Sequence, residues 1–164
     1  MIKELWTLAK MLFQSKPSEI EEVKLMGMDH FPFKGYAYIT WCGKMIYRND
    51  MYDVRRKEWI TKKYKVSKNH ETIHLMQAKI CGSWVKYYLS YLWEWLKGGI
   101  IMAPVSAANY TIPYEVEAYA NEGNFDYPKN YDGSNLAKYT FKNRKKLYKK
   151  YGSTQMWVYY LKTL

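Results

Sequence analysis

Two of the chain's three histidines stand four residues apart, in the segment His70-Glu71-Thr72-Ile73-His74. On a helix, residues i and i+4 share one face, so both imidazoles can bind a single metal ion. Glu71 would then lie beside the open coordination position. There its carboxylate can accept a proton from an attacking water and pass it to a leaving amine. The pattern H-E-x-x-H therefore predicts a catalytic zinc ion, one per chain, with Glu71 as the general base.

A catalytic zinc ion usually takes a third protein ligand and leaves its fourth position to water. The remaining histidine, His30, has no spacing that favours it. The segment PYEVEAYANE, residues 113–122, offers the carboxylates Glu115 and Glu117. Side chains two positions apart on a helix point in very different directions, so only one of the two can face the ion.

The H-E-x-x-H motif, followed by E-x-x-A on a second helix, resembles the gluzincins, the zincin-type zinc peptidases whose third ligand is a glutamate. In the closest pattern of that family, the glutamate opens an E-x-x-A-D string. Laid over it, Glu115 takes the ligand position and Ala118 supplies a small residue for close helix packing. The resemblance thus implies a zinc site of His70, His74 and Glu115. This chain departs from the pattern at Tyr119, where the family has an aspartate that supports a zinc-binding histidine.

Three more residues of the second helix are expected near the ion. Glu122, one turn beyond Tyr119, is expected to support a histidine in place of the missing aspartate. Glu117 and Tyr119 are kept as further supporting groups or alternative ligands. The chain is also similar to small uncharacterised bacterial proteins that combine a PFKGY-type segment, a hairpin ending in arginine, an aromatic-rich HExxH helix and a PxExEAYxNE segment. This similarity implies the fold and the metal site, and it indicates no substrate.

Four elements are expected to position these residues. They are an N-terminal amphipathic helix and loop (1–22), a β-hairpin (31–48), the motif helix (67–97) and the glutamate helix (113–122). Ser67 or Asn69 is the expected N-cap of the motif helix, and a last helix is expected within 136–161. The predicted fold is α+β and mostly helical, a single zincin-like domain over 1–164 with a small antiparallel β-hairpin.

Two features near the motif have alternative interpretations. An apolar and aromatic stripe on the motif helix is typical of a core rather than a substrate groove, and Gln77 within it is expected to have a structural hydrogen-bonding role. The members of this stripe are Gln77, Cys81, Trp84, Tyr88, Leu92 and Trp95. The hairpin either offers an edge strand to an extended peptide or only covers the core.

The charge balance bears on partners. Lys and Arg outnumber Asp and Glu by 26 to 15, which favours acidic partners such as nucleic acid or an anionic membrane surface. Runs of basic residues, however, usually serve solubility. The basic and aromatic segment FKNRKKLYKKY is compatible with nucleic acid but equally with a solvated helix face. Residues 2–13 are expected to dock on their own domain, with contact to a membrane surface as the alternative. Charged residues interrupt the apolar stretch 80–105, so no transmembrane span is expected.

No clear signal peptide precedes the domain, so we expect a cytoplasmic protein. The leading hypothesis is a zinc metallopeptidase acting on peptide or protein substrates. The first alternative is a catalytically inactive zinc-binding protein that uses a basic and aromatic surface to bind a partner, nucleic acid or a membrane surface. The second alternative is a basic nucleic-acid or membrane-surface module in which the motif is a coincidence.

Overall fold

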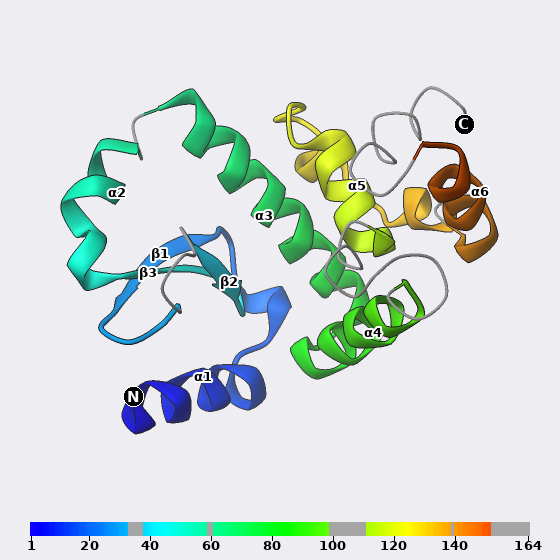
Figure 1. The fold of residues 1–164 in the computed structure, drawn as a ribbon. Coiled ribbons are helices and arrows are strands. Elements are labelled where there is room, and N and C mark those ends of the chain that lie inside the picture. The colour runs from blue at the N-terminus through cyan, green and yellow to red at the C-terminus, as the bar shows by residue number, and fades with distance from the viewer. Residues whose placement is uncertain (33–37, 59–60, 99–110, 139, 152–164) are drawn as a thin grey trace.

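The structure, a computed structural model, describes residues 1–32, 38–58, 61–98, 111–138 and 140–151. Its helices and strands are α1 (Ile2–Gln14), β1 (Lys24–Met28), β2 (Ile39–Trp41), β3 (Lys44–Arg48), α2 (Tyr52–Glu58), α3 (Lys62–Cys81), α4 (Trp84–Lys97), α5 (Pro113–Asn121) and α6 (Phe141–Tyr151). Short 3₁₀ helices cover Pro17–Glu19, Asn49–Met51, Pro128–Asn130 and Ser134–Lys138. The fold is α+β and mostly helical. The small sheet lies between α1 and α3, while α4, α5 and α6 gather around the C-terminal part of α3 (Figure 1).

The predicted hairpin is confirmed over Ile39–Arg48, where β2 and β3 pair antiparallel. Cys42 and Gly43 make the two-residue turn with positive φ angles of 47° and 74°, as tight hairpin turns of this kind require. Residues 33–37 of the predicted hairpin lie outside the described residues. The sequence did not predict β1, which pairs parallel to β3 and gives the mixed order β1-β3-β2.

Successive residues of β3 join the sheet to both neighbouring helices. Met45 and Ile46 are adjacent, so their side chains point to opposite faces of the sheet. Met45 belongs to the main core together with Leu75 of α3. Ile46 packs in a second cluster with Leu8 of α1. The sheet is therefore held between α1 on one face and α3 on the other, which places the motif helix directly over the strands.

The expectation of one motif helix over 67–97 is wrong, because the chain turns at Gly82. This glycine ends α3 with a φ of 78°, and its N–H donates to the carbonyls of the last turn. A left-handed residue at this position suits glycine, which has no Cβ to clash. Ser83 then begins α4, and its side chain accepts a hydrogen bond from the backbone N–H of Lys86. The Gly-Ser pair thus works as a helix stop followed by a helix start.

The start of the motif helix also differs from expectation. Thr61 is the N-cap of α3, and its hydroxyl accepts a hydrogen bond from the backbone N–H of Tyr64. Ser67 and Asn69, the predicted caps, lie inside the helix. The charged residues before them have high helix propensity, which allows α3 to begin a turn earlier than the apolar pattern indicates.

Helices α1, α5 and α6 agree with the sequence analysis, whereas α2 was not predicted. The N-terminal segment forms α1 followed by a 3₁₀ turn, and α5 begins at Pro113 as predicted. The C-terminal helix is α6, whereas residues 152–164 of the predicted range lie outside the described part of the chain. Among the described residues, no helix combines the length and the apolar character that a bilayer crossing requires.

Candidate metal centre

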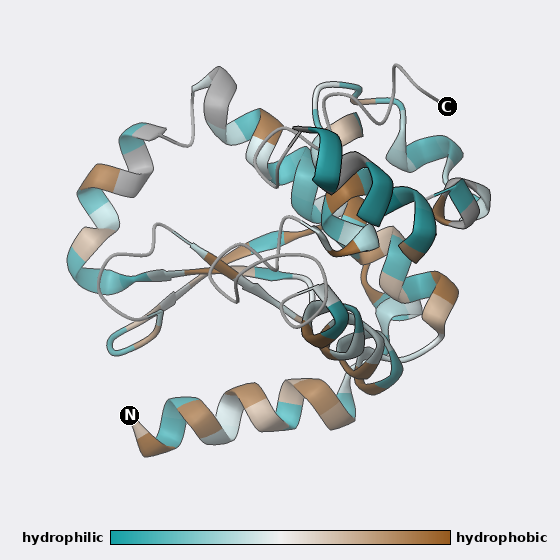
Figure 2. Ribbon diagram, turned by 45° about the vertical axis from the view of Figure 1, so that its right-hand side comes forward, coloured by the Kyte–Doolittle hydropathy of each residue, from teal (hydrophilic) through white to brown (hydrophobic). Residues whose placement is uncertain are grey.

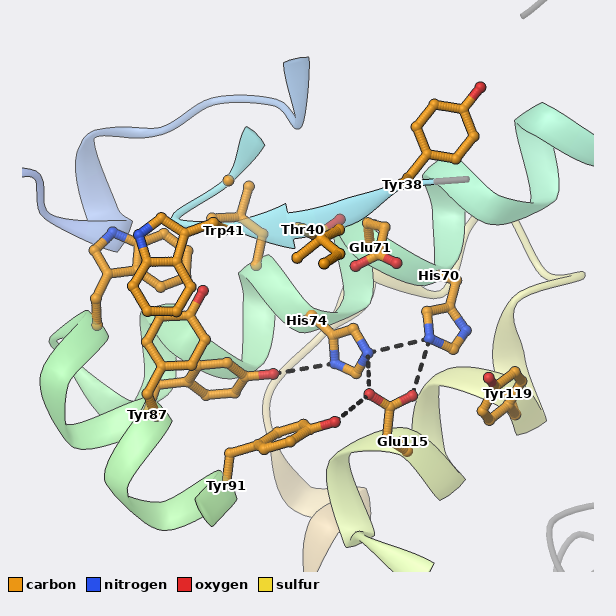
Figure 3. Close-up of a pocket in the computed structure, with 15 residues that line it drawn as sticks. Tyr38, Thr40, Trp41, His70, Glu71, His74, Tyr87, Tyr91, Glu115 and Tyr119 are labelled. Carbon is orange, nitrogen blue, oxygen red and sulfur yellow. Dashed lines mark hydrogen bonds and ion pairs between the residues drawn. The ribbon is translucent and has the colours of Figure 1, made fainter. Parts of the chain in front are cut away.

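The three predicted metal ligands meet at one point between α3 and α5 (Figure 3). His70 and His74 lie one turn apart on α3, with their Nε2 atoms 3.1 Å from each other. Glu115, in the first turn of α5, places Oε2 3.2 Å from Nε2 of His70 and Oε1 3.3 Å from Nε2 of His74. One ligand atom from each residue lies within 4.8 Å of the other two. The structure therefore brings together the ligand set that the sequence analysis selected.

This set of donor atoms fits a zinc ion. Two imidazole nitrogens and one carboxylate are the protein ligands of one common class of catalytic zinc site. Both histidines are also buried, so most of each imidazole is shielded from bulk solvent. A third requirement is that each ligating nitrogen offers a lone pair, which depends on what the opposite ring nitrogen binds.

For His74 this requirement is met by Gln77. The side-chain nitrogen of Gln77 donates to the carbonyl oxygen of Tyr114 at 3.0 Å and to a carboxylate oxygen of Glu117 at 2.7 Å. Both partners accept hydrogen bonds, so the Gln77 amide has only one orientation that satisfies them. Its oxygen then lies 2.7 Å from Nδ1 of His74 and accepts the Nδ1 proton. The hydroxyl of Tyr87 lies 3.1 Å from the same nitrogen. In the neutral imidazole, Nε2 of His74 then has a lone pair that faces the site.

Glu117 does not join the ligand cluster. It is fully buried on the far side of Gln77, and the hydroxyls of Tyr127 and Tyr131 donate to its carboxylate at 2.8 and 3.0 Å. Burial raises the pKa of Glu117, in opposition to the hydrogen bonds from Gln77 and the two tyrosines. Glu117 is therefore a buried support for Gln77, and Glu115 is the glutamate that faces the histidines. Glu115 and Glu117 have different roles because residues two positions apart on a helix point in very different directions.

For His70 the supporting group is Glu122, the residue that the sequence analysis expected in this role. Its Oε2 lies 3.0 Å from Nδ1 of His70. The buried side chain of Asn69 donates to the backbone oxygens of Glu122 and Asn124 at 2.8 and 3.0 Å, which fixes the end of α5 against α3. Tyr119 contacts the imidazole edge-on, with ring centroids 4.5 Å apart. The sequence analysis missed the role of Asn69, although it directly precedes the motif.

The electrostatics of the centre favour positive charge between the imidazoles. Burial disfavours the Glu115 carboxylate, but His74 and His70 lower its pKa well below the ordinary range. Burial likewise opposes protonation of His70, but its hydrogen bonds to Glu115 and Glu122 raise its pKa to about 10. The hydroxyl of Tyr91 donates to Glu115 at 2.8 Å and orients the carboxylate. A proton or a divalent cation can supply the charge that this arrangement stabilises.

The centre opens into a cleft of about 520 Å³. Glu71 lines this cleft without joining the ligands, and its carboxylate lies on the β2 side of the two imidazoles (Figure 3). All three residues of β2 contribute to the cleft wall. Aromatic side chains of α4 line another part of it, namely Trp84, Tyr87, Tyr88 and Tyr91.

The aromatic stripe is only partly core. Trp84 is buried, as predicted, but it also lines the cleft together with Tyr88. Leu92 is exposed, because the break at Gly82 rotates α4 relative to a continuous helix. The same rotation turns Tyr87 and Tyr91 toward the metal ligands, a role that the sequence analysis missed. Tyr87 and Tyr91 are four residues apart and so share one face of α4. This spacing could have indicated their role if the helix break at Gly82 had been predicted.

The basic segment of α6 is partly structural. Arg144 is buried, and its guanidinium donates to Glu94 at 2.6 Å and to the backbone oxygen of Thr111. This pairing ties α6 to α4. Exposed charge on α6 is left to lysines such as Lys142 and Lys146. The segment is therefore a helix with one packed side and one solvated side.

Comparison of the chain with protein-family models, with curated proteins and with solved structures finds no match.

Proposed function

We propose that the protein is a zinc-dependent peptidase of the gluzincin type, built on a minimal zincin-like fold. One zinc ion per chain would be held by His70, His74 and Glu115. The observation that carries this proposal is the convergence of these three side chains, each supported from behind by a further group. If the H-E-x-x-H motif were a coincidence, this second layer of hydrogen bonds behind the three side chains would not be expected.

The chain's own residues suit peptide hydrolysis. A bound zinc ion supplies Lewis-acid polarisation of the scissile carbonyl and acidifies water at the site. Glu71, on the cleft wall beside the histidines, accepts a proton from the attacking water and delivers it to the leaving amine. Gln77 and Glu122 hold the two imidazoles in orientation throughout. Tyr91 holds the Glu115 carboxylate.

The substrate proposed for the cleft is an extended peptide. Among the described strands, β2 lies at the edge of the sheet, and its three residues line the cleft. An extended chain can add to such an edge through main-chain hydrogen bonds. The aromatic walls from α4 would then accommodate large apolar side chains near the scissile bond. This favours the first of the two interpretations of the hairpin.

The test is hydrolysis of a mixed peptide library by the zinc-loaded protein and by its Glu71→Gln variant. The wild type is expected to cleave, and Glu71→Gln is expected to keep zinc while losing about 10²- to 10⁴-fold in rate, the usual contribution of a general base. Glu19→Gln, at an exposed residue of the 3₁₀ turn after α1, is the matched control. Full activity in Glu71→Gln would contradict the mechanism. A zinc-bound wild type that cleaves nothing would favour the alternative, an inactive zinc-binding protein.

A further inference from the structure

The apolar side of helix α1 is wider than the part of it that packs against the sheet. Leu8 points inward and packs against the sheet. Ile2, Trp6 and Phe13 occupy the opposite side and are exposed, Trp6 by 63%. A surface helix normally presents charged and polar residues to solvent on this side. The exposed apolar residues of α1 therefore favour contact with a further apolar surface over contact with water.

Helix α4 repeats this pattern. Its inward face carries the buried residues Trp84 and Tyr87. Its outward face exposes Leu89, Leu92 and Trp93, the last by 62%. The helices α1 and α4 contact each other and form the lower side of the molecule in the view of Figure 1. Apolar residues are visible along both helices in Figure 2.

The charges on these two helices are sorted by sign. Their glutamates turn inward: Glu4 accepts from the backbone N–H groups of Asp29 and His30, and Glu94 pairs with Arg144. The exposed charges are lysines. They are Lys3 and Lys10 on α1 and Lys86 on α4. The solvent side of both helices thus combines large apolar side chains with positive charge.

Lysines also accompany the two exposed tryptophans. The ammonium group of Lys10 lies 5.6 Å from the ring centre of Trp6. That of Lys97 lies 5.7 Å from the ring centre of Trp93 and also pairs with Glu94, so Lys10 is the one of the two whose charge has no ion-pair partner among the described residues. An indole with a neighbouring lysine suits the boundary between lipid tails and head groups, because the ring enters the boundary while the amine reaches phosphate.

We propose that the outward faces of α1 and α4 bind the surface of an anionic lipid bilayer. Apolar and aromatic residues would insert at the head-group boundary, and the lysines would meet lipid phosphates. A second copy of the chain is disfavoured as the occupant, because pairing two such faces would bring lysines together. The net charge of +11 adds a long-range attraction to the same surface.

This attachment would leave the cleft close to the bilayer. The indole N–H of Trp41, a cleft residue, donates to the backbone oxygen of Leu8 at 2.9 Å. One side of α1 thus contacts the cleft wall, while its other side would contact lipid. The distance between them is about one helix diameter, roughly 10 Å.

The test is flotation of the full-length protein with two kinds of vesicle, phosphatidylcholine alone and phosphatidylcholine with about one quarter phosphatidylglycerol. The wild type is expected to float only with the anionic vesicles, and added salt should weaken binding. The double variant Trp6→Glu/Trp93→Glu is expected to lose at least about tenfold in binding. The matched control is Phe125→Glu, which introduces the same charge at an exposed aromatic residue outside α1 and α4. Circular dichroism checks that each variant is folded.

A second variant set tests the lysines without disturbing the apolar faces. Each of Lys3→Gln, Lys10→Gln and Lys86→Gln is expected to weaken binding to anionic vesicles about fivefold. Glu71→Gln should float like the wild type, so failure of the peptidase proposal leaves this one intact. No binding of the wild type to anionic vesicles would overturn the proposal. So would equal binding of the double tryptophan variant, or a wild-type dimer that this variant dissociates.

Discussion

The side-chain oxygen of Gln77 lies 2.7 Å from Nδ1 of His74, while its nitrogen donates to Glu117. The buried Glu117 carboxylate and the Tyr114 carbonyl together orient the Gln77 amide, so that its oxygen accepts the proton on Nδ1 of His74. A buried carboxylate has a large desolvation cost, and Tyr127 and Tyr131 offset part of it by donating to the same group. Buried groups of the core thus hold the His74 imidazole in one orientation. Such support is expected behind a metal-binding histidine and not behind a surface histidine.

Replacing the donor in the hydrogen bond from Gln77 to Glu117 by an acceptor should weaken zinc binding. In Gln77→Glu, two carboxylates would face each other, and we expect zinc affinity to fall by about 10- to 100-fold, the usual effect of losing a support behind a ligand. The double variant Gln77→Glu/Glu117→Gln restores a donor opposite an acceptor. It should recover part of the loss, with the remainder due to the Tyr114 carbonyl, which loses its donor. Competition titration with a chelator measures both affinities. Equal losses in the single and double variants would refute the relay from Glu117 to His74.

Zinc binding should release protons. Burial opposes the charge on His70, but Glu115 and Glu122 raise its pKa from 6.5 to about 10 in the metal-free protein. At neutral pH a metal ion must therefore displace the His70 proton, so affinity should rise by about tenfold per pH unit until the pH reaches about 10. Calorimetry in buffers of different ionisation enthalpy counts the protons released. An affinity that does not change over this range would contradict the prediction.

The same pKa shift predicts how the metal-free protein's stability depends on pH. Because the folded-state pKa of His70 lies above the unfolded value, its contribution to stability is fully present below pH 6.5. It is lost as the pH rises through about 10. Urea unfolding across this range should show declining stability without zinc and a smaller decline with zinc, because the ion replaces the proton. A free energy of unfolding that rises with pH over this range, in the absence of zinc, would contradict the prediction.

The turn at Gly82 should be sensitive to any side chain. Its φ of 78° is unfavourable for residues with a Cβ, so Gly82→Ala is expected to destabilise the protein by roughly 1 kcal/mol. Gly123→Ala is the matched control: an added Cβ at either glycine meets no atom within 4 Å, but only Gly82 has a positive φ. Its effect should stay within about 0.5 kcal/mol. Chemical unfolding measures both, and equal effects would argue against the strained corner.

The cluster of candidate metal ligands could be predicted from sequence because it depends on local geometry. The four-residue spacing of His70 and His74 on a helix fixes a shared face, whatever the rest of the fold does. Glu115 and Glu117 were separated by the same geometry together with the family pattern. Glu122 followed from one further turn of that helix. Each of these inferences needs only the type of the element and the position within it.

The missed features depend on contacts between distant segments. Strand β1 is short and contains Gly27, and its parallel pairing with β3 leaves no local pattern in the sequence. The break at Gly82 had a local signal, but the apolar run through it favoured a single helix. The error in phase then concealed Tyr91, whose contact with Glu115 appears only when α4 turns back toward α5.

The most direct test of the account is the zinc content of the purified protein after reconstitution and dialysis. Elemental analysis should find about one zinc ion per chain in the wild type, held by the buried cluster of His70, His74 and Glu115. His74→Ala and Glu115→Ala should lose it, and Glu117→Gln should keep it. No zinc in the wild type, or zinc that survives the loss of Glu115 but not the change at Glu117, would contradict the central claim.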